Sequence, residues 1–173
     1  MRTLHASAFC CATLLWLGCS AIPVQFPAPT TGTGSPAPGG ATGSATSQEV
    51  VEYTNQERSR AGLPSLRANA RLMEAALIHA NQMAEAQQSA HTIAGARYPT
   101  LESRLQAVGY QYLGAAENIA WNQRTAREVM ASWMSSSGHR RNILDPSLTE
   151  MGAAVARSSR GEPYWVQVFG LPR

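Results

Sequence analysis

Apolar residues recur three or four positions apart through much of the chain, which is the spacing of an amphipathic helix. The alanine-rich segment 67–88 carries the longest such pattern. Thr46 with Glu49 and Thr125 with Glu128 are spaced as capping boxes that open two further helices. The pattern predicts four helices: one from Thr46 that ends before Gly62, then 67–88, 100–108, and one from Thr125 that ends in the stretch 135–138.

The pattern changes to short apolar runs near the C-terminus. Segments 151–156 and 164–169 flank the turn-forming stretch 158–163, which predicts a β-hairpin. The apolar segment 119–121 is expected to add a third strand. Helices would then cover both faces of a small sheet. We expect an α+β fold, a three-layer α/β/α sandwich with a small, mainly antiparallel sheet.

The first residues read as a secretory signal. An apolar stretch, 6–17, follows Arg2 and is too short to span a bilayer, and small residues come after it. We predict a signal peptide over 1–21. Two readings of its end stay open: cleavage after Ala21, or a lipoprotein signal in which Cys19 is lipidated. The string Leu-Gly-Cys at 17–19 resembles a bacterial lipobox, although Trp16 stands where that motif usually has an aliphatic residue.

Residues 22–46 are rich in proline, glycine, alanine, threonine and serine, which predicts an extended linker that tethers the domain. The folded domain is expected over 47–173, a length that suits a single core. All three cysteines lie before it, at 10, 11 and 19. The domain is therefore predicted to contain no disulfide, no thiol nucleophile and no thiolate metal ligand.

The charged residues do not indicate a nucleic-acid partner. Of the 173 residues, 14% are charged, and all 14 positive side chains are arginines, scattered without a basic run. Without Arg2 the domain keeps 13 arginines against 11 carboxylates, a net charge of +2. We therefore expect no nucleic-acid partner. We also expect an exported monomer, extracellular or in the cell envelope, that meets a membrane only through a lipid anchor.

Three histidines and one carboxylate are the candidates for chemistry. His79 lies on the alanine-rich helix and is interpreted as structural. His91 lies in a polar loop past that helix, where a side chain is free to face a cleft. His139 is expected near the start of a helical turn, which favours a neutral imidazole. Glu117 enters an apolar segment without a charged neighbour, so it needs a partner.

Several strings in this chain resemble the bacterial CAP domain, a superfamily that includes cysteine-rich secretory proteins, venom allergen 5 and plant pathogenesis-related 1 proteins. The resemblance, also called SCP-like, covers nearly all of residues 48–170. Its most specific part is the ENIAW segment followed by the W-x-x-S-x-G-H-R-x-N-I-L pattern. The strings are NQER at 55–58, GLP at 62–64, the loop His91, ENIAW at 117–121, WMSSSGHRRNIL at 133–144 and YWVQVF at 164–169.

The resemblance implies a three-layer α/β/α fold and a central cavity. His91, Glu117 and His139 match three of the four cavity residues of the family. Ser136 stands at the fourth position, where many eukaryotic members have glutamate, and the disulfides of the animal and plant forms are absent. The implied metal ligands are His91 and His139 with Glu117 nearby. Zinc or another divalent ion, with water as a further ligand, is the candidate cofactor.

Two classes of function follow from the resemblance. The first is a non-catalytic exported binding module whose cavity holds a small apolar, lipid or glycan ligand, or a cell-wall component. The second is a hydrolase acting on peptide or cell-wall material, either metal-dependent or with Ser136 as nucleophile and His139 as base. We favour the binding module, because a shared fold does not imply a shared activity and Ser136 weakens the ligand set that a metal-dependent hydrolase needs. The serine mechanism is disfavoured because no strained elbow or oxyanion hole is visible and clustered serines ordinarily cap helices.

Overall fold

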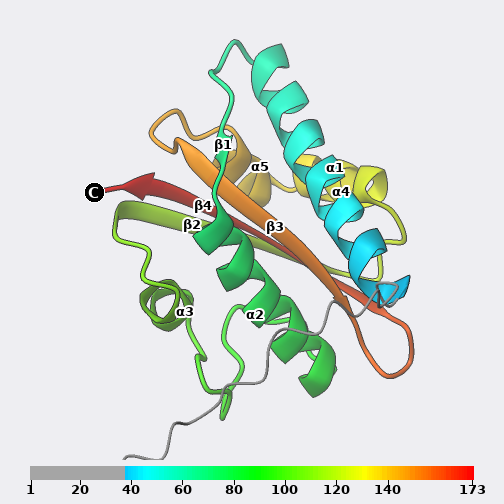
Figure 1. The fold of residues 1–173 in the computed structure, drawn as a ribbon. Coiled ribbons are helices and arrows are strands. Elements are labelled where there is room, and N and C mark those ends of the chain that lie inside the picture. Colours follow the sequence, from blue (N-terminus) through cyan, green and yellow to red (C-terminus); the bar gives the residue numbers. More distant parts are fainter. Residues whose placement is uncertain (1–37) are drawn as a thin grey trace, which may run out of the picture. The chain divides into compact units, whose positions relative to one another are not determined.

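The computed structural model describes residues 38–173, with side chains from residue 46 onward. The predicted signal peptide, Cys19 and most of the predicted linker lie outside the described residues. Five helices and four strands make up the described part (Figure 1). In chain order they are α1 Pro38–Arg60, β1 Arg67–Ala68, α2 Ala70–Ala86, α3 Leu101–Ala107, β2 Tyr112–Trp121, α4 Ala126–Ser135, α5 Ser137–Ile143, β3 Glu150–Arg157 and β4 Pro163–Pro172.

The four strands form one mixed sheet in the order β1-β3-β4-β2. The short β1 runs parallel to β3, and the other neighbours are antiparallel. The predicted hairpin is confirmed as β3 and β4, in which Ala154 lies opposite Val166. Strand β2 pairs only with β4 and so forms one edge of the sheet, with Glu117 opposite Val168.

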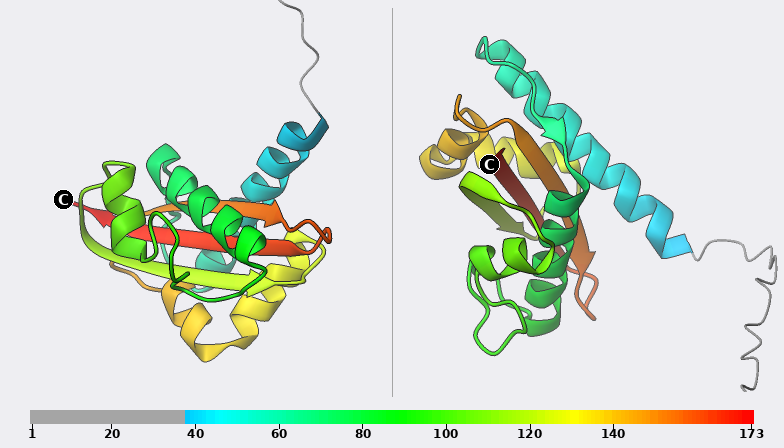
Figure 2. Two further views of the ribbon diagram at one scale, coloured as in Figure 1. Left: turned by 90° about the horizontal axis from the view of Figure 1, so that it is seen from below. Right: turned by 60° about the vertical axis from the view of Figure 1, so that its left-hand side comes forward.

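Helices cover both faces of the sheet, with α2 and α3 on one side and α4 and α5 on the other (Figure 2). Successive residues of β4 point to opposite faces, as in any strand. Val166 and Val168 pack in the core beneath α2 and α3, whereas Trp165 and Phe169 pack in a second core with residues of α1, α4 and α5. The predicted α+β sandwich of three layers is confirmed.

The starts of three elements differ most from the sequence predictions. Helix α1 begins at Pro38, inside the predicted linker, so Thr46 is not its cap. Proline suits the first position of a helix because its φ is already helical and its missing N–H is not needed there. Helix α2 begins at Ala70 because Asn69 caps the helix, and because Arg67 and Ala68, which precede Asn69, pair with β3. Strand β2 starts at Tyr112, well before the predicted segment.

Close approach of α2 to β3 depends on one glycine. A Cβ atom at Gly152 would lie 2.1 Å from the backbone nitrogen of Met73. Only a residue without a side chain lets the helix backbone lie this near the strand. The contact fixes the position of α2, which carries His79 toward the neighbouring strands.

No helix among the described residues is both long enough and apolar enough to cross a bilayer.

Candidate functional site

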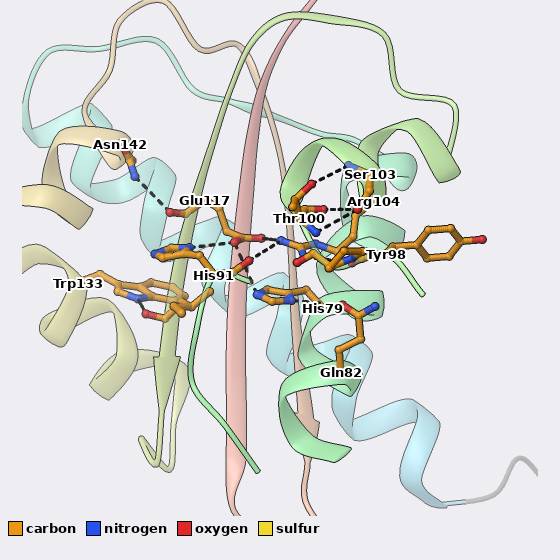
Figure 3. A network of polar contacts seen from close by, with 12 residues as sticks. His79, Gln82, His91, Tyr98, Thr100, Ser103, Arg104, Glu117, Trp133 and Asn142 are labelled. Carbon is orange, nitrogen blue, oxygen red and sulfur yellow. Dashed lines mark hydrogen bonds and ion pairs between the residues drawn. The ribbon is translucent and has the colours of Figure 1, made fainter. Parts of the chain in front are cut away.

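Glu117 is the centre of a buried polar cluster beside the edge strand β2 (Figure 3). Its side chain is only 3% exposed. Oε2 accepts a hydrogen bond from Arg104 Nη2 at 2.7 Å, and Oε1 lies 2.9 Å from His91 Nδ1. His79 Nε2 lies 3.7 Å from the same Oε1. The buried carboxylate therefore has the partner that sequence reasoning required, and that partner is a guanidinium.

Arg104 was not singled out from the sequence. It lies on α3 and is fully buried. Besides binding Glu117, its guanidinium donates to the backbone carbonyls of Pro99 at 3.1 Å, Tyr98 at 3.4 Å and His91 at 3.5 Å. Thr100 caps the same helix through its hydroxyl. Arg104 thus connects two segments by hydrogen bonds: the loop that contains His91 and the strand that contains Glu117.

One ring nitrogen of His91 is held by a hydrogen bond, while much of the side chain is exposed. Its side chain is 58% exposed, although Nδ1 is held by the buried carboxylate. An ionised carboxylate only accepts hydrogen bonds, so Nδ1 carries the hydrogen. In the neutral imidazole, Nε2 then keeps a free lone pair. The lone pair can act chemically as a hydrogen-bond acceptor, a metal ligand or a base.

His79 was predicted to be structural, and it packs in the interior next to the site. It is fully buried on α2, and its Nε2 has no hydrogen-bond partner among the described residues. Burial lowers the pKa of His79, although the nearby Glu117 raises it in part. His79 is therefore an uncharged neighbour of the carboxylate.

The opposite side of β2 is tied to α5 by amide side chains. Asn142 donates to the backbone carbonyl of Glu117 at 3.3 Å and to Asn118 Oδ1 at 2.9 Å. Asn118 in turn donates to the backbone carbonyl of His139 at 3.2 Å and to Gln167 Oε1 at 3.1 Å. These bonds satisfy polar groups at the sheet edge and hold α5 beside the strand.

The four predicted cavity residues are not all brought together. His139 is half-buried on α5, and burial, together with the charge of His91, lowers its pKa. Its Nδ1 is buried and has no hydrogen-bond partner in the described part of the chain. Ser136 lies at the junction of α4 and α5, and its side chain makes no capping hydrogen bond there. Only His91 and Glu117 are joined directly.

A cavity of about 430 Å³ lies at this site. Its walls combine hydroxyl, amide and carboxylate groups with small apolar side chains. Ser136 and His139 are not among the lining residues, which are His91, Thr92, Thr100, Leu101, Glu102, Ala115, Ala116, Glu117 and Asn142. A volume of this size suits a small ligand.

The side chains in place do not fit a divalent metal. One oxygen of Glu117 is bound to Arg104, whose fixed positive charge repels a cation, and the other is bound to His91. His139 is not joined to this pair. Residues 46–173 contain no group of three or more histidine, cysteine, aspartate or glutamate side chains arranged to hold a metal ion. Arg104 supplies the positive charge beside Glu117.

The domain is thus a small mixed sheet between helices, with a histidine and a glutamate joined at its edge strand. The profile of CAP, the cysteine-rich secretory protein family, matches residues 51–169. The chain therefore belongs to the CAP family, as its motifs predicted.

Two relatives of this chain come from Bacillus subtilis. The uncharacterized protein YkwD of Bacillus subtilis is 35% identical over 126 residues, which cover 73% of this chain and 47% of YkwD. The uncharacterized membrane protein YlbC of the same organism is 29% identical over 122 residues, which cover 70% of this chain and 33% of YlbC. The chain thus matches less than half the length of either relative.

Solved structures show the same fold. An extracellular protein with an SCP domain from Bacillus anthracis superposes with a TM-score of 0.69 at 26% identity, covering 80% of this chain and 45% of that one. An outer surface protein from Borrelia burgdorferi superposes with a TM-score of 0.66 at 17% identity. The match covers 73% of this chain and 92% of that protein. The second likeness supports the fold alone.

Proposed function

We propose that this protein is an extracellular binding module whose ligand occupies the cavity beside β2 and donates a hydrogen bond to His91 Nε2. The observation that carries the proposal is the His91–Glu117 pair, in which a buried carboxylate holds one ring nitrogen of a histidine that lines the cavity. Orientation of this kind favours binding of a defined hydrogen-bond donor.

The cavity walls favour a small glycan fragment over a purely aliphatic ligand. Thr92, Glu102 and Asn142 provide polar groups, whereas Leu101 and Ala116 provide apolar contacts. A sugar ring presents hydroxyl groups and an apolar face, so it suits such a lining. An extracellular site agrees with the extracellular location of the related protein from Bacillus anthracis and with the predicted signal peptide.

The same pair supports a second candidate, a hydrolase in which His91 acts as general base. A carboxylate that orients an imidazole is a common arrangement for proton abstraction. Ser136 does not line this cavity, so the nucleophile would be water rather than that serine. The reaction would move a proton from water to His91 Nε2 while the water oxygen attacks the scissile bond, and His91 would then return that proton to the leaving group as the bond breaks.

A titration distinguishes these functions. The full chain is titrated with chitotriose and with maltotriose, in EDTA, by calorimetry. We expect His91→Phe, which keeps a ring but loses the acceptor, to weaken binding about tenfold, as the loss of one well-made hydrogen bond would. Leu113→Ala is the matched control, because Leu113 is an exposed residue of β2 outside the cavity lining.

Mass spectrometry of the sugars after the titration completes the test. Intact sugars with weakened binding by His91→Phe support the binding module. Shortened sugars from the wild type, and not from His91→Phe, would favour the hydrolase. Equal affinity of the wild type and His91→Phe for each sugar would contradict the proposed site.

A further inference from the structure

A second cavity lies on the other side of α5. It has a volume of about 600 Å³ and shares no lining residue with the cavity beside β2. Helix α5 contributes to both: Asn142 lines the β2 cavity, while Ser137, Arg140 and Arg141 line the second one. The full lining is Met134, Ser135, Ser137, Arg140, Arg141, Leu144, Asp145 and Pro146.

Two guanidinium groups at this cavity have no partner among the side chains that the structure describes. Within residues 46–173, no hydrogen bond, ion pair or ring contact involves the side chain of Arg140 or Arg141. Arg104, by contrast, is bound to a carboxylate and several carbonyls. Adjacent like charges on one short helix repel each other, so a bound anion would relieve a cost already present in the fold.

The acidic residue in the wall does not neutralise this charge. The carboxylate of Asp145 accepts hydrogen bonds from the backbone N–H and the hydroxyl of Ser147, at 2.8 and 2.6 Å. Arg58 lies beneath the same segment, where it donates to the carbonyls of Ile143 and Asp145 at 2.9 and 2.8 Å. The charges of Arg58 and Asp145 act on one another, so Arg58, Asp145, Arg140 and Arg141 together carry a net charge of +2.

Apolar side chains complete the lining. Met134, Leu144 and Pro146 contribute to the walls, so part of any ligand would lie against hydrocarbon. We propose that this cavity binds a soluble organic phosphate, with the phosphate on Arg140 and Arg141 and a short apolar stem against the other wall. Guanidinium groups suit phosphate because their donors match its oxygens. A concave cavity of this volume favours a small molecule over a membrane surface.

Calorimetry of the full chain with hexyl phosphate tests the site. We expect saturable binding by the wild type, about tenfold weaker binding for Arg140→Gln and for Arg141→Gln, and loss of binding when both are changed. Arg124→Gln is the matched control, since Arg124 also has no side-chain partner among the described residues but does not line the cavity. It should bind like the wild type.

Three further probes complete the test. Inorganic phosphate should bind more weakly than hexyl phosphate, and hexanol should not bind detectably. Equal binding by the wild type and the double variant would overturn the proposal, as would binding to vesicles made with phosphatidylglycerol in the absence of binding to hexyl phosphate. His91→Phe should bind hexyl phosphate normally, so failure here is distinguishable from failure at the β2 cavity.

Discussion

Replacing Arg104 by methionine tests how the site is held together. The substitution removes the guanidinium that lies 2.7 Å from Glu117 and leaves the carboxylate buried. Breaking a buried ion pair from one side costs about 3–5 kcal/mol of unfolding free energy. The carbonyl of Pro99 also loses its donor. We expect a loss near the upper end of that range, a large part of the roughly 5–15 kcal/mol that typically stabilises a domain.

Urea unfolding followed by tryptophan fluorescence measures the loss. The double variant Arg104→Met/Glu117→Leu should be more stable than Arg104→Met alone, because it leaves no uncompensated charge in the interior. Arg104→Lys keeps the charge but not the planar set of donors, so it should fall between the wild type and Arg104→Met. A loss below about 1 kcal/mol for Arg104→Met, or additive losses in the double variant, would refute the reasoning.

Other changes probe the rest of the fold and site. Gly152→Ala should destabilise the protein by about 2–3 kcal/mol because its Cβ would collide with the backbone of α2, whereas Gly114→Ala, whose nearest contact is at 3.9 Å, should cost far less on urea unfolding. Because burial lowers the pKa of His79, the unfolded chain takes up a proton near pH 6.5 that the folded chain does not. Stability should therefore fall as pH drops below about 6.5, with a shallower slope in His79→Phe; an unchanged slope would contradict this. Arg58→Met should cost about 3 kcal/mol in thermal unfolding, because four backbone carbonyls, two of them in buried hydrogen bonds, lose their donor. Calorimetry with Zn²⁺ should show no site-specific heat in the wild type and no difference in His91→Ala.

Local signals in the sequence predicted four of the five described helices and three of the four described strands, because most of these elements are set by neighbours along the chain. Thr125 caps α4, as its spacing from Glu128 predicted, and Thr100 caps the short helix that was expected to begin there. The start of α2 was missed because the pairing of 67–68 with β3 joins segments far apart in the chain. Such pairing leaves no periodic signal in a segment of two residues.

The site was predicted in part for the same reason. His91 and Glu117 stood out as polar residues in unusual places, and motif resemblance supported both. Arg104 was missed because, on a short amphipathic helix, an arginine that enters the core has the same local pattern as one that faces water. A buried carboxylate at Glu117 was the one available signal, since it requires a positive partner from elsewhere in the chain.

The protonation of His91 tests the central claim most directly. Long-range ¹H–¹⁵N correlation spectra of the imidazoles, recorded at a pH well above the usual pKa of about 6.5, distinguish which ring nitrogen carries the hydrogen. The structure predicts that Nδ1 of His91 is protonated and Nε2 is bare, and that Glu117→Gln weakens this preference. A hydrogen on Nε2 in the wild type, or the same spectrum in Glu117→Gln, would contradict the account of the site.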